Sequence, residues 1–201
     1  MRAVALRRAA AVVLVLAAFV AGPMSPGRAE TAISITVSVI DSFDPRDPQR
    51  RQFGALEFRG GLQLSSSERN FGGLSAIRVR PDGAHFIAVT DKAYWLRGRI
   101  VYHDGAPAGI ADAAMAPMLG ADGKPLADRG WYDTEALAED GGALYVGIER
   151  VHQIVRFDFA RNGFAARGTP LPVPAAFAKL PANRGVECLL AAPKAARWVV
   201  R

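Results

Sequence analysis

Three stretches of the sequence share one pattern, and this repeat limits the folds open to the chain more than any other feature. In each stretch an apolar run leads through a short turn to a second apolar run that ends on or near an acid. The stretches are 73–91, 133–149 and 185–200. Each is therefore expected to form a β-hairpin. Ser75, Glu135 and Glu187 take equivalent positions, 60 and then 52 residues apart, a spacing close to that of one four-stranded propeller blade with an inserted loop.

The remaining sequence also favours strands. Residues 33–40 alternate apolar and small polar side chains, the period of a half-buried strand. Further short apolar runs, each bounded by turn-forming residues, are 55–58, 76–79, 85–90, 100–102, 143–148 and 153–159. The Ala-, Pro- and Gly-rich stretch 106–130 is expected to be an excursion between units that contains one helical turn. We predict an all-β, β-propeller-like fold, with a sandwich or a barrel as the alternatives.

The repeat predicts how many blades the chain can hold. Residues 30–201 are long enough for about three units of this size, whereas closed propellers need at least about four. The 14-residue step from Glu135 to Glu149, applied to Glu187, reaches the last residue, Arg201. We therefore expect an incomplete, truncated propeller, or a ring completed from elsewhere. Poor stability and poor activity are expected because open strand edges would remain.

Residues 1–29 have the layout of a secretory signal peptide. Arginines precede an apolar run of 13 residues, 9–21, and small residues up to Ala29 form a cleavage site. A permanent membrane anchor would need roughly 20 apolar residues, so cleavage near Ala29 is the preferred interpretation. The mature domain, 30–201, is then periplasmic or secreted.

Removal of the signal peptide changes the charge of the protein. The whole chain has 25 basic and 19 acidic side chains. Because residues 1–29 hold four arginines and no acid, the mature part keeps 21 basic against 19 acidic, a net charge of +2. No Lys/Arg run reaches the length of a binding tail, so we expect no nucleic-acid partner. The single cysteine, Cys188, cannot form an internal disulfide and is expected to be a small buried side chain.

Several segments, in the same order, resemble the phytase-like (esterase-like phytase) family of exported bacterial β-propellers. They cover about two thirds of the chain, from residue 71 onward: Phe71-Gly72-Gly73-Leu74-Ser75, Val89-Thr90-Asp91, Asp133-Thr134-Glu135 with Leu137, Leu144-Tyr145-Val146 with Glu149-Arg150, and Asn183-Arg184-Gly185-Val186-Glu187. The resemblance implies that residues 30–201 form a propeller with acids at one end of its channel. In the similar calcium-dependent propeller phytases, such acids hold calcium ions that bridge substrate phosphates and activate water.

The sequence departs from the family pattern at three places. The glycine that usually follows the family's glutamate is Ala136 in one unit and Cys188 in another, and an Asp-Arg pair is replaced by Asp91-Lys92. Glycine at such a position would let the backbone approach an ion or ligand closely. These departures weaken the prediction most for the third unit.

Acids that recur at equivalent positions beside apolar strands are the candidate calcium ligands. They are Asp91, Asp133, Glu135, Glu149 and Glu187. Calcium takes six to eight oxygen ligands, so acids that converge from neighbouring units suit it. Glu135, Glu149 and Glu187 are also the candidate catalytic carboxylates. The alternative is that each acid ends a strand and faces solvent.

Basic residues next to these acids are candidates for substrate binding. Arg150 and Arg184 present a planar fork that suits phosphate oxygens, and Lys92 offers a point charge. Their alternative role is a salt bridge to the same acids. Ser75 lacks the second glycine and the strand-to-helix setting of a nucleophile elbow, so a serine-hydrolase mechanism is disfavoured.

These features predict a phytase-like hydrolase that acts on a small anionic phosphoester with calcium. The alternative is a non-catalytic propeller that binds a ligand or partner through the same face, because the fold hosts both kinds of function.

Overall fold

Strands dominate the computed structural model, which describes residues 30–181, 184–192 and 195–199. The predicted signal peptide, 1–29, and Asn183 lie outside the described residues. The single described α-helix, α1 (Phe159–Asn162), has four residues. No helix in the described ranges is therefore long and apolar enough to cross a bilayer.

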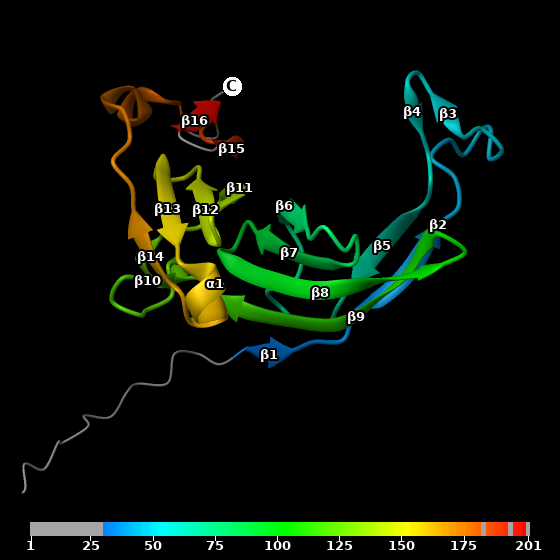
Figure 1. Cartoon of the computed structure of the whole chain (residues 1–201), viewed down its shortest axis with the longest axis horizontal. Helices are drawn as coiled ribbons and strands as arrows, with labels where there is room; N and C mark the ends of the chain where they lie inside the picture. The colour runs from blue at the N-terminus through cyan, green and yellow to red at the C-terminus, as the bar shows by residue number, and fades with distance from the viewer. Residues whose placement is uncertain (1–29, 182–183, 193–194, 200–201) are drawn as a thin grey trace, which may run out of the picture.

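The first repeat unit is an antiparallel meander of four strands (Figure 1). Its strands are β6 (Leu74–Val79), β7 (His85–Thr90), β8 (Tyr94–His103) and β9 (Ala106–Pro117). The short strand β1 (Thr31–Ala32) pairs with β9, so the sheet has the order β1-β9-β8-β7-β6.

The second unit repeats this arrangement. Its antiparallel strands are β11 (Thr134–Asp140), β12 (Ala143–Ile148), β13 (Gln153–Phe157) and β14 (Arg167–Pro170). The strand β10 (Leu119–Gly120) joins β14 in parallel, which gives the order β10-β14-β13-β12-β11.

A hairpin of β15 (Cys188–Ala192) and β16 (Ala195–Val199) forms the third unit. Strand β11 contacts both β6 and β15, so the first strands of successive units are neighbours. This order is expected for successive propeller blades, but none of the described sheets closes on itself. The all-β prediction is confirmed, and the propeller and its blade number stay predictions.

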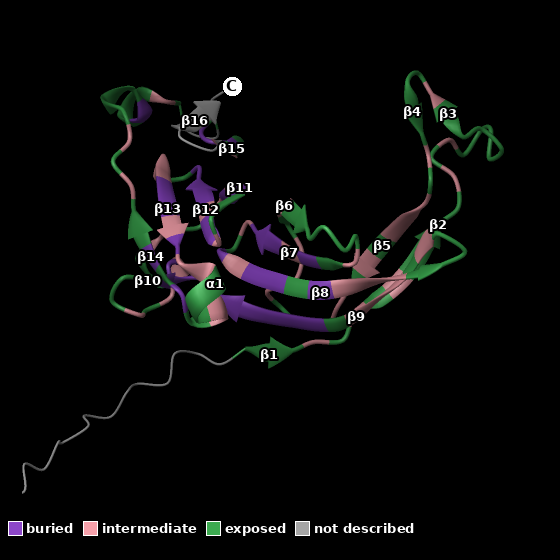
Figure 2. Cartoon of the chain, viewed as in Figure 1, coloured by how far each residue is buried: buried purple, intermediate pink, exposed green. Residues whose placement is uncertain are grey.

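An arm extends away from the two main sheets (Figure 1). Strands β2 (Thr36–Ile40) and β5 (Gly61–Ser65) pair in its lower part, and the two-residue strands β3 (Gln52–Phe53) and β4 (Leu56–Glu57) pair beyond them. Most of its residues are exposed or only partly buried (Figure 2).

The prediction for residues 106–130 was wrong over residues 106–117, although the predicted helical turn is present further along. Residues 106–117 are not an excursion but the longest strand, β9. The stretch is rich in alanine, which has low intrinsic β-propensity, yet Ala114 and Ala116 are buried where β9 pairs with β8. Tertiary packing of small side chains therefore determines this strand. The helical element further along is a single 3₁₀ turn, Ala127–Arg129.

A shared core lies between the two large sheets. Trp95 on β8 meets Phe157 on β13 edge to face, with ring centroids 5.1 Å apart, and neither side chain is exposed. Val89 and Val146, from the central strands β7 and β12, belong to the same cluster. This core holds the acid-bearing ends of the two units next to each other.

Candidate functional site

Three carboxylates from the second unit come together at one edge of its sheet. Asp133 precedes β11, Glu135 lies in β11, and Glu149 follows β12. Each offers an oxygen, and these oxygens all lie within 4.8 Å of one another. The antiparallel pairing of Thr134 with Ile148 explains the meeting, because it brings the start of β11 to the end of β12.

The equivalent hairpin of the first unit has the same backbone geometry. The register shifts between Leu74 and Ala76 in β6, and between Thr134 and Ala136 in β11, so Ser75 and Glu135 occupy equivalent β-bulges. The N–H of Asp91 donates to the Gly73 carbonyl at 2.8 Å. In the second unit the N–H of Glu149 donates to the Asp133 carbonyl, also at 2.8 Å. The predicted equivalence of positions 75 and 135 is confirmed.

Asp91 connects the two units. Its carbonyl accepts the N–H of Asp133 at 2.5 Å, which places the start of β11 against the end of β7. The Asp91 side-chain oxygen Oδ1 is buried and has no hydrogen-bond partner in the described part of the chain. Gly73 adopts a φ of +55°, and a Cβ at this position would overlap the Asp91 carboxyl group. Glycine is required there for Asp91 to take its place.

Glu149 is the most buried member of the cluster, with 7% of its surface exposed. Its Oε1 accepts the N–H of Gly185 at 2.9 Å. A Cβ at Gly185 would lie only 2.7 Å from Glu149 Cγ, so this close approach depends on glycine. His152 lies beside the same glycine, and its Nδ1 is buried without a hydrogen-bond partner among the described residues.

The cluster carries concentrated negative charge. Burial raises the pKa of Glu135, and the charges of Asp133, Glu149 and Asp91 raise it further, while a hydrogen bond from Ser75 acts in the opposite direction. Within the described ranges, no Lys or Arg forms a salt bridge with any of the four acids. A hard cation such as Ca²⁺ fits this set of carboxylate oxygens, and the unpartnered Asp91 Oδ1 could serve as one more ligand.

The other predicted site residues lie outside this group of carboxylates. Glu187 is exposed, and so are Arg184 and Lys92. Arg150 is exposed as well, with its guanidinium carbon 4.5 Å from the centre of the Tyr132 ring. The expected alternative, a salt bridge from Arg150 or Arg184 to these acids, does not occur in the described part of the structure. The predicted roles of Glu187 and of the basic residues stay predictions.

Cys188 is exposed, so the prediction that it is buried was wrong. It begins β15, where alternate residues point to opposite sides of the strand. The next residue, Leu189, is the buried one.

A hollow of about 500 Å³ opens beside Asp91 and Asp133. Its volume is in the range of small-molecule sites. The other lining residues are Arg69, Asn70, Lys92, Tyr94, Ala127, Asp128 and Tyr132. The Nζ of Lys92 donates to the Arg69 carbonyl at 2.9 Å, which fixes its ammonium group at the rim. The sequence did not predict that Arg69, Asn70 and Tyr132 line this hollow. They could have been found because they lie within two residues of the family-like segments that begin at residues 71 and 133.

These features define a class: an all-β protein of repeated antiparallel hairpins whose acids converge in a candidate site for a hard cation. A family model described as "Phytase-like: Esterase-like activity of phytase" matches residues 69–200, and the chain belongs to this family. The match confirms the resemblance found in the sequence. No curated protein and no solved structure matches the chain.

Proposed function

We propose that this protein is an exported hydrolase that cleaves small anionic phosphoesters with the assistance of calcium. Membership of the Phytase-like family indicates a hydrolase-like function. The observation that carries the finer proposal is the convergence of Asp133, Glu135 and Glu149, whose oxygens lie within 4.8 Å of one another. The layout of residues 1–29 supports export to the periplasm or the medium.

Four acids would hold the ion. Asp133, Glu135 and Glu149 offer converging oxygens, and Asp91 offers the buried Oδ1; Glu187 is a further predicted ligand. When bound, calcium would supply positive charge that stabilises the phosphate group and lowers the pKa of a water molecule. Among the predicted catalytic carboxylates, Glu135 is best placed to accept a proton, because Glu149 already accepts the Gly185 N–H and Glu187 lies outside the cluster.

The hollow beside the acids provides a place for the phosphoester. Arg69 and Lys92 supply positive charge on its wall, and Tyr132 supports the neighbouring guanidinium of Arg150. An anionic substrate would be attracted by these cations while its phosphate lies towards Asp91 and Asp133. Arg184 precedes Gly185, which contacts Glu149, and is the predicted second guanidinium for the phosphate.

A turnover assay tests this proposal. The purified chain would be incubated with a chromogenic phosphate ester and with phytate, in calcium and in a chelator. We expect slow turnover that requires calcium and falls at least about a hundredfold in Glu135→Gln. Glu57→Gln is the matched control, because Glu57 is an exposed glutamate on β4 in the arm.

Absence of turnover with every divalent metal tested, together with a melting temperature that chelation leaves unchanged, would contradict the hydrolase. That result would favour the non-catalytic, ligand-binding alternative. Equal loss of activity in Glu135→Gln and Glu57→Gln would also contradict the assigned role of Glu135.

A further inference from the structure

A second hollow, of about 520 Å³, lies between the two large sheets, away from the acids. His85 at the start of β7 lines it, whereas Asp91 follows the end of the same strand. Six residues of extended strand separate them by about 20 Å. The hollow is therefore distinct from the candidate calcium site and from the hollow beside it.

The strand register places four arginines on one face of the first sheet, and three of them, Arg78, Arg80 and Arg97, line this hollow. Arg78 on β6 is paired with Ile87, which is paired with Arg97 on β8. One step along, the Arg80 N–H bonds the His85 carbonyl at 2.8 Å, and His85 is paired with Arg99. Directly paired residues, and residues two apart, share a face. Arg78, Arg80, Arg97 and Arg99 therefore share one face with His85, and we call it the arginine face.

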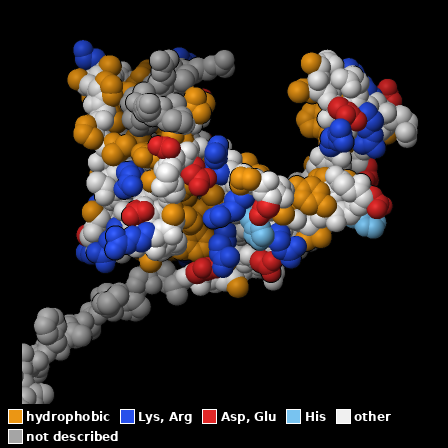
Figure 3. Space-filling view, in the orientation of Figure 1, with side chains coloured by type: hydrophobic (Ala, Val, Ile, Leu, Met, Phe, Trp, Pro, Cys, Tyr) orange, Lys and Arg blue, Asp and Glu red, His pale blue; other side chains and the backbone are white. Residues whose placement is uncertain are grey.

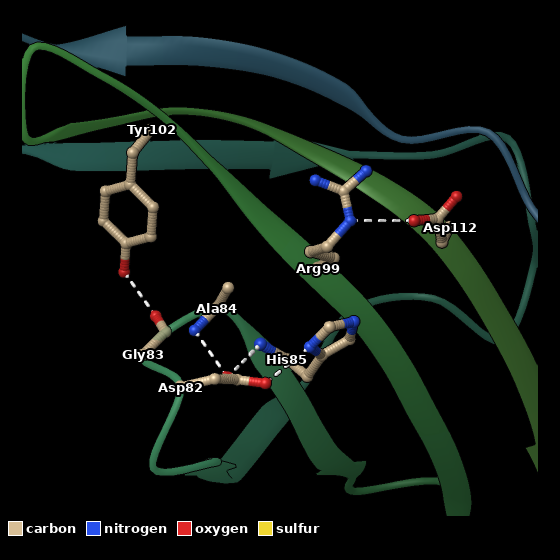
Figure 4. A network of polar contacts seen from close by, with 7 residues as sticks. All are labelled: Asp82, Gly83, Ala84, His85, Arg99, Tyr102 and Asp112. Atoms are coloured by element: carbon tan, nitrogen blue, oxygen red, sulfur yellow. Dashed lines mark hydrogen bonds and ion pairs between the residues drawn. The ribbon is translucent and has the colours of Figure 1, made fainter.

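Part of this face is already neutralised (Figure 4). His85 Nδ1 lies 2.7 Å from Asp82 Oδ2, and Arg99 Nε donates to Asp112 Oδ2 at 3.0 Å. Arg97 forms a salt bridge with Glu30.

Two guanidinium groups of the arginine face remain available. Arg78 and Arg80 are exposed, and neither side chain has a hydrogen bond or salt bridge to a residue within 30–181. Among the acids that line the hollow, Asp82 and Asp112 are paired with His85 and Arg99. Glu139 on β11 forms no salt bridge with a described residue. In Figure 3 the Lys and Arg side chains gather in a column over this part of the molecule, next to a hydrophobic hollow.

The second unit supplies the opposite wall. Leu144 from β12 and Phe159 from α1 add apolar surface to the hollow, and Phe159 packs on Trp95 with ring centroids 5.3 Å apart. A ligand here would contact guanidinium groups on one side and apolar side chains on the other. The volume suits a small molecule, and the guanidinium fork matches phosphate oxygens in a bidentate way.

We propose that the arginine face is a second ligand site, which binds a small molecule carrying at least two phosphate groups. Arg78 and Arg80 bind the phosphates, Arg97 and Arg99 on β8 are held by Glu30 and Asp112, and the wall of Leu144 and Phe159 covers the ligand. The site needs no metal. Its test therefore does not depend on whether the protein hydrolyses phosphoesters with calcium.

Calorimetric titration with inorganic pyrophosphate tests this site. The buffer would be freed of divalent cations with a chelating resin, because a soluble polyanionic chelator would compete. We expect saturable binding that weakens at least tenfold in Arg78→Ala/Arg80→Ala and tightens in Glu139→Gln. Arg46→Ala/Arg59→Ala removes two exposed arginines from the arm and should leave the affinity unchanged. Circular dichroism and melting curves would confirm that each variant keeps its fold.

Three results would overturn the site: no saturable binding, equal loss in the control pair, or loss in Lys92→Ala with full retention in Arg78→Ala/Arg80→Ala. The last would place the anion in the hollow beside the acids. Tighter binding of a single-stranded oligonucleotide than of pyrophosphate would overturn the assignment of a small ligand.

Discussion

Gly73 and Gly185 determine where the carboxyl groups of Asp91 and Glu149 lie. Gly73 leaves room for the carboxyl group of Asp91, and Gly185 approaches Glu149 closely enough to donate its N–H to Oε1. Neither glycine bears charge or chemistry of its own. They act because glycine has no Cβ, which leaves room for the backbone and an acidic side chain to approach each other.

Replacement of Gly73 by alanine should weaken calcium binding about tenfold or more. The new methyl group would overlap the Asp91 carboxyl and displace it from the cluster. Gly72→Ala is the matched control, because Gly72 also has a positive φ but a Cβ there meets no atom within 4 Å. Calorimetric titration of both variants with Ca²⁺ measures the difference. Equal affinities in the two variants would argue against a role for Asp91.

Glu135→Gln should stabilise the metal-free protein by about 1 kcal/mol or less, since the side chain is only partly buried. This corresponds to a melting temperature higher by roughly 2 to 4 °C or less. The raised pKa means that the folded protein holds this proton to higher pH than the unfolded chain does. The carboxylate therefore destabilises the fold at neutral pH.

The pH dependence checks the sign of this effect. The destabilisation should disappear as the pH falls through the raised pKa of Glu135 towards its ordinary value of 4.5. Melting curves of wild type and Glu135→Gln in calcium-free buffer should thus converge at acidic pH. A variant that is less stable than wild type at neutral pH would contradict the proposed repulsion.

Hairpins are the elements that the sequence predicts best. Strands β7 and β12 coincide with the predicted ranges 85–90 and 143–148. The turn between β11 and β12 consists of Gly141 and Gly142, both with positive φ, as a tight two-residue turn demands. Strand β9 was missed because its alanines and glycine show neither strong β-propensity nor clear alternation; only its buried place beside β8 explains it.

The turn between β6 and β7 depends on Asp82. Its carboxylate accepts N–H groups of Ala84 and His85, and these bonds with the His85 side chain lower the pKa of Asp82 to about 2. Asp82→Ala should therefore lower the urea midpoint at neutral pH, whereas Asp47→Ala, at an exposed residue, should not.

Because the Asp82 pKa is lowered, its stabilisation is fully present above the ordinary value of 3.8 and is lost as the pH falls through about 2. The difference between wild type and Asp82→Ala should shrink over this range. A difference that stays constant down to about pH 2 would show that the charge of Asp82 is not responsible.

At the scale of the whole molecule, the core between the sheets holds the two acid-bearing edges together. Phe157→Ala should cost about 3 to 5 kcal/mol, because it empties space beside Trp95. Phe43→Ala, at a ring that is 71% exposed on the arm, should cost less than about 1 kcal/mol. Chemical denaturation measures both. Similar losses in the two variants would contradict a core centred on Trp95 and Phe157.

Only part of the candidate calcium site could be predicted from the sequence. The acids could be found because they recur at equivalent positions of a repeat, and Asp133, Glu135 and Glu149 do converge. The hollow beside them could not, since its wall joins Arg69 and Ala127, which are far apart in the sequence. Only the packing of one sheet against the other brings such segments together.

Calcium binding by the carboxylate cluster is the most direct test of the central claim. Calorimetric titration of the metal-free protein with Ca²⁺ should show saturable binding with a Kd of about 10⁻⁶ to 10⁻³ M. Glu149→Gln should weaken this binding at least tenfold, while the retained side-chain oxygen can still accept the Gly185 N–H. Absence of saturable binding, or a Glu149→Gln variant that binds as tightly as wild type, would contradict the assignment of this cluster as a calcium site.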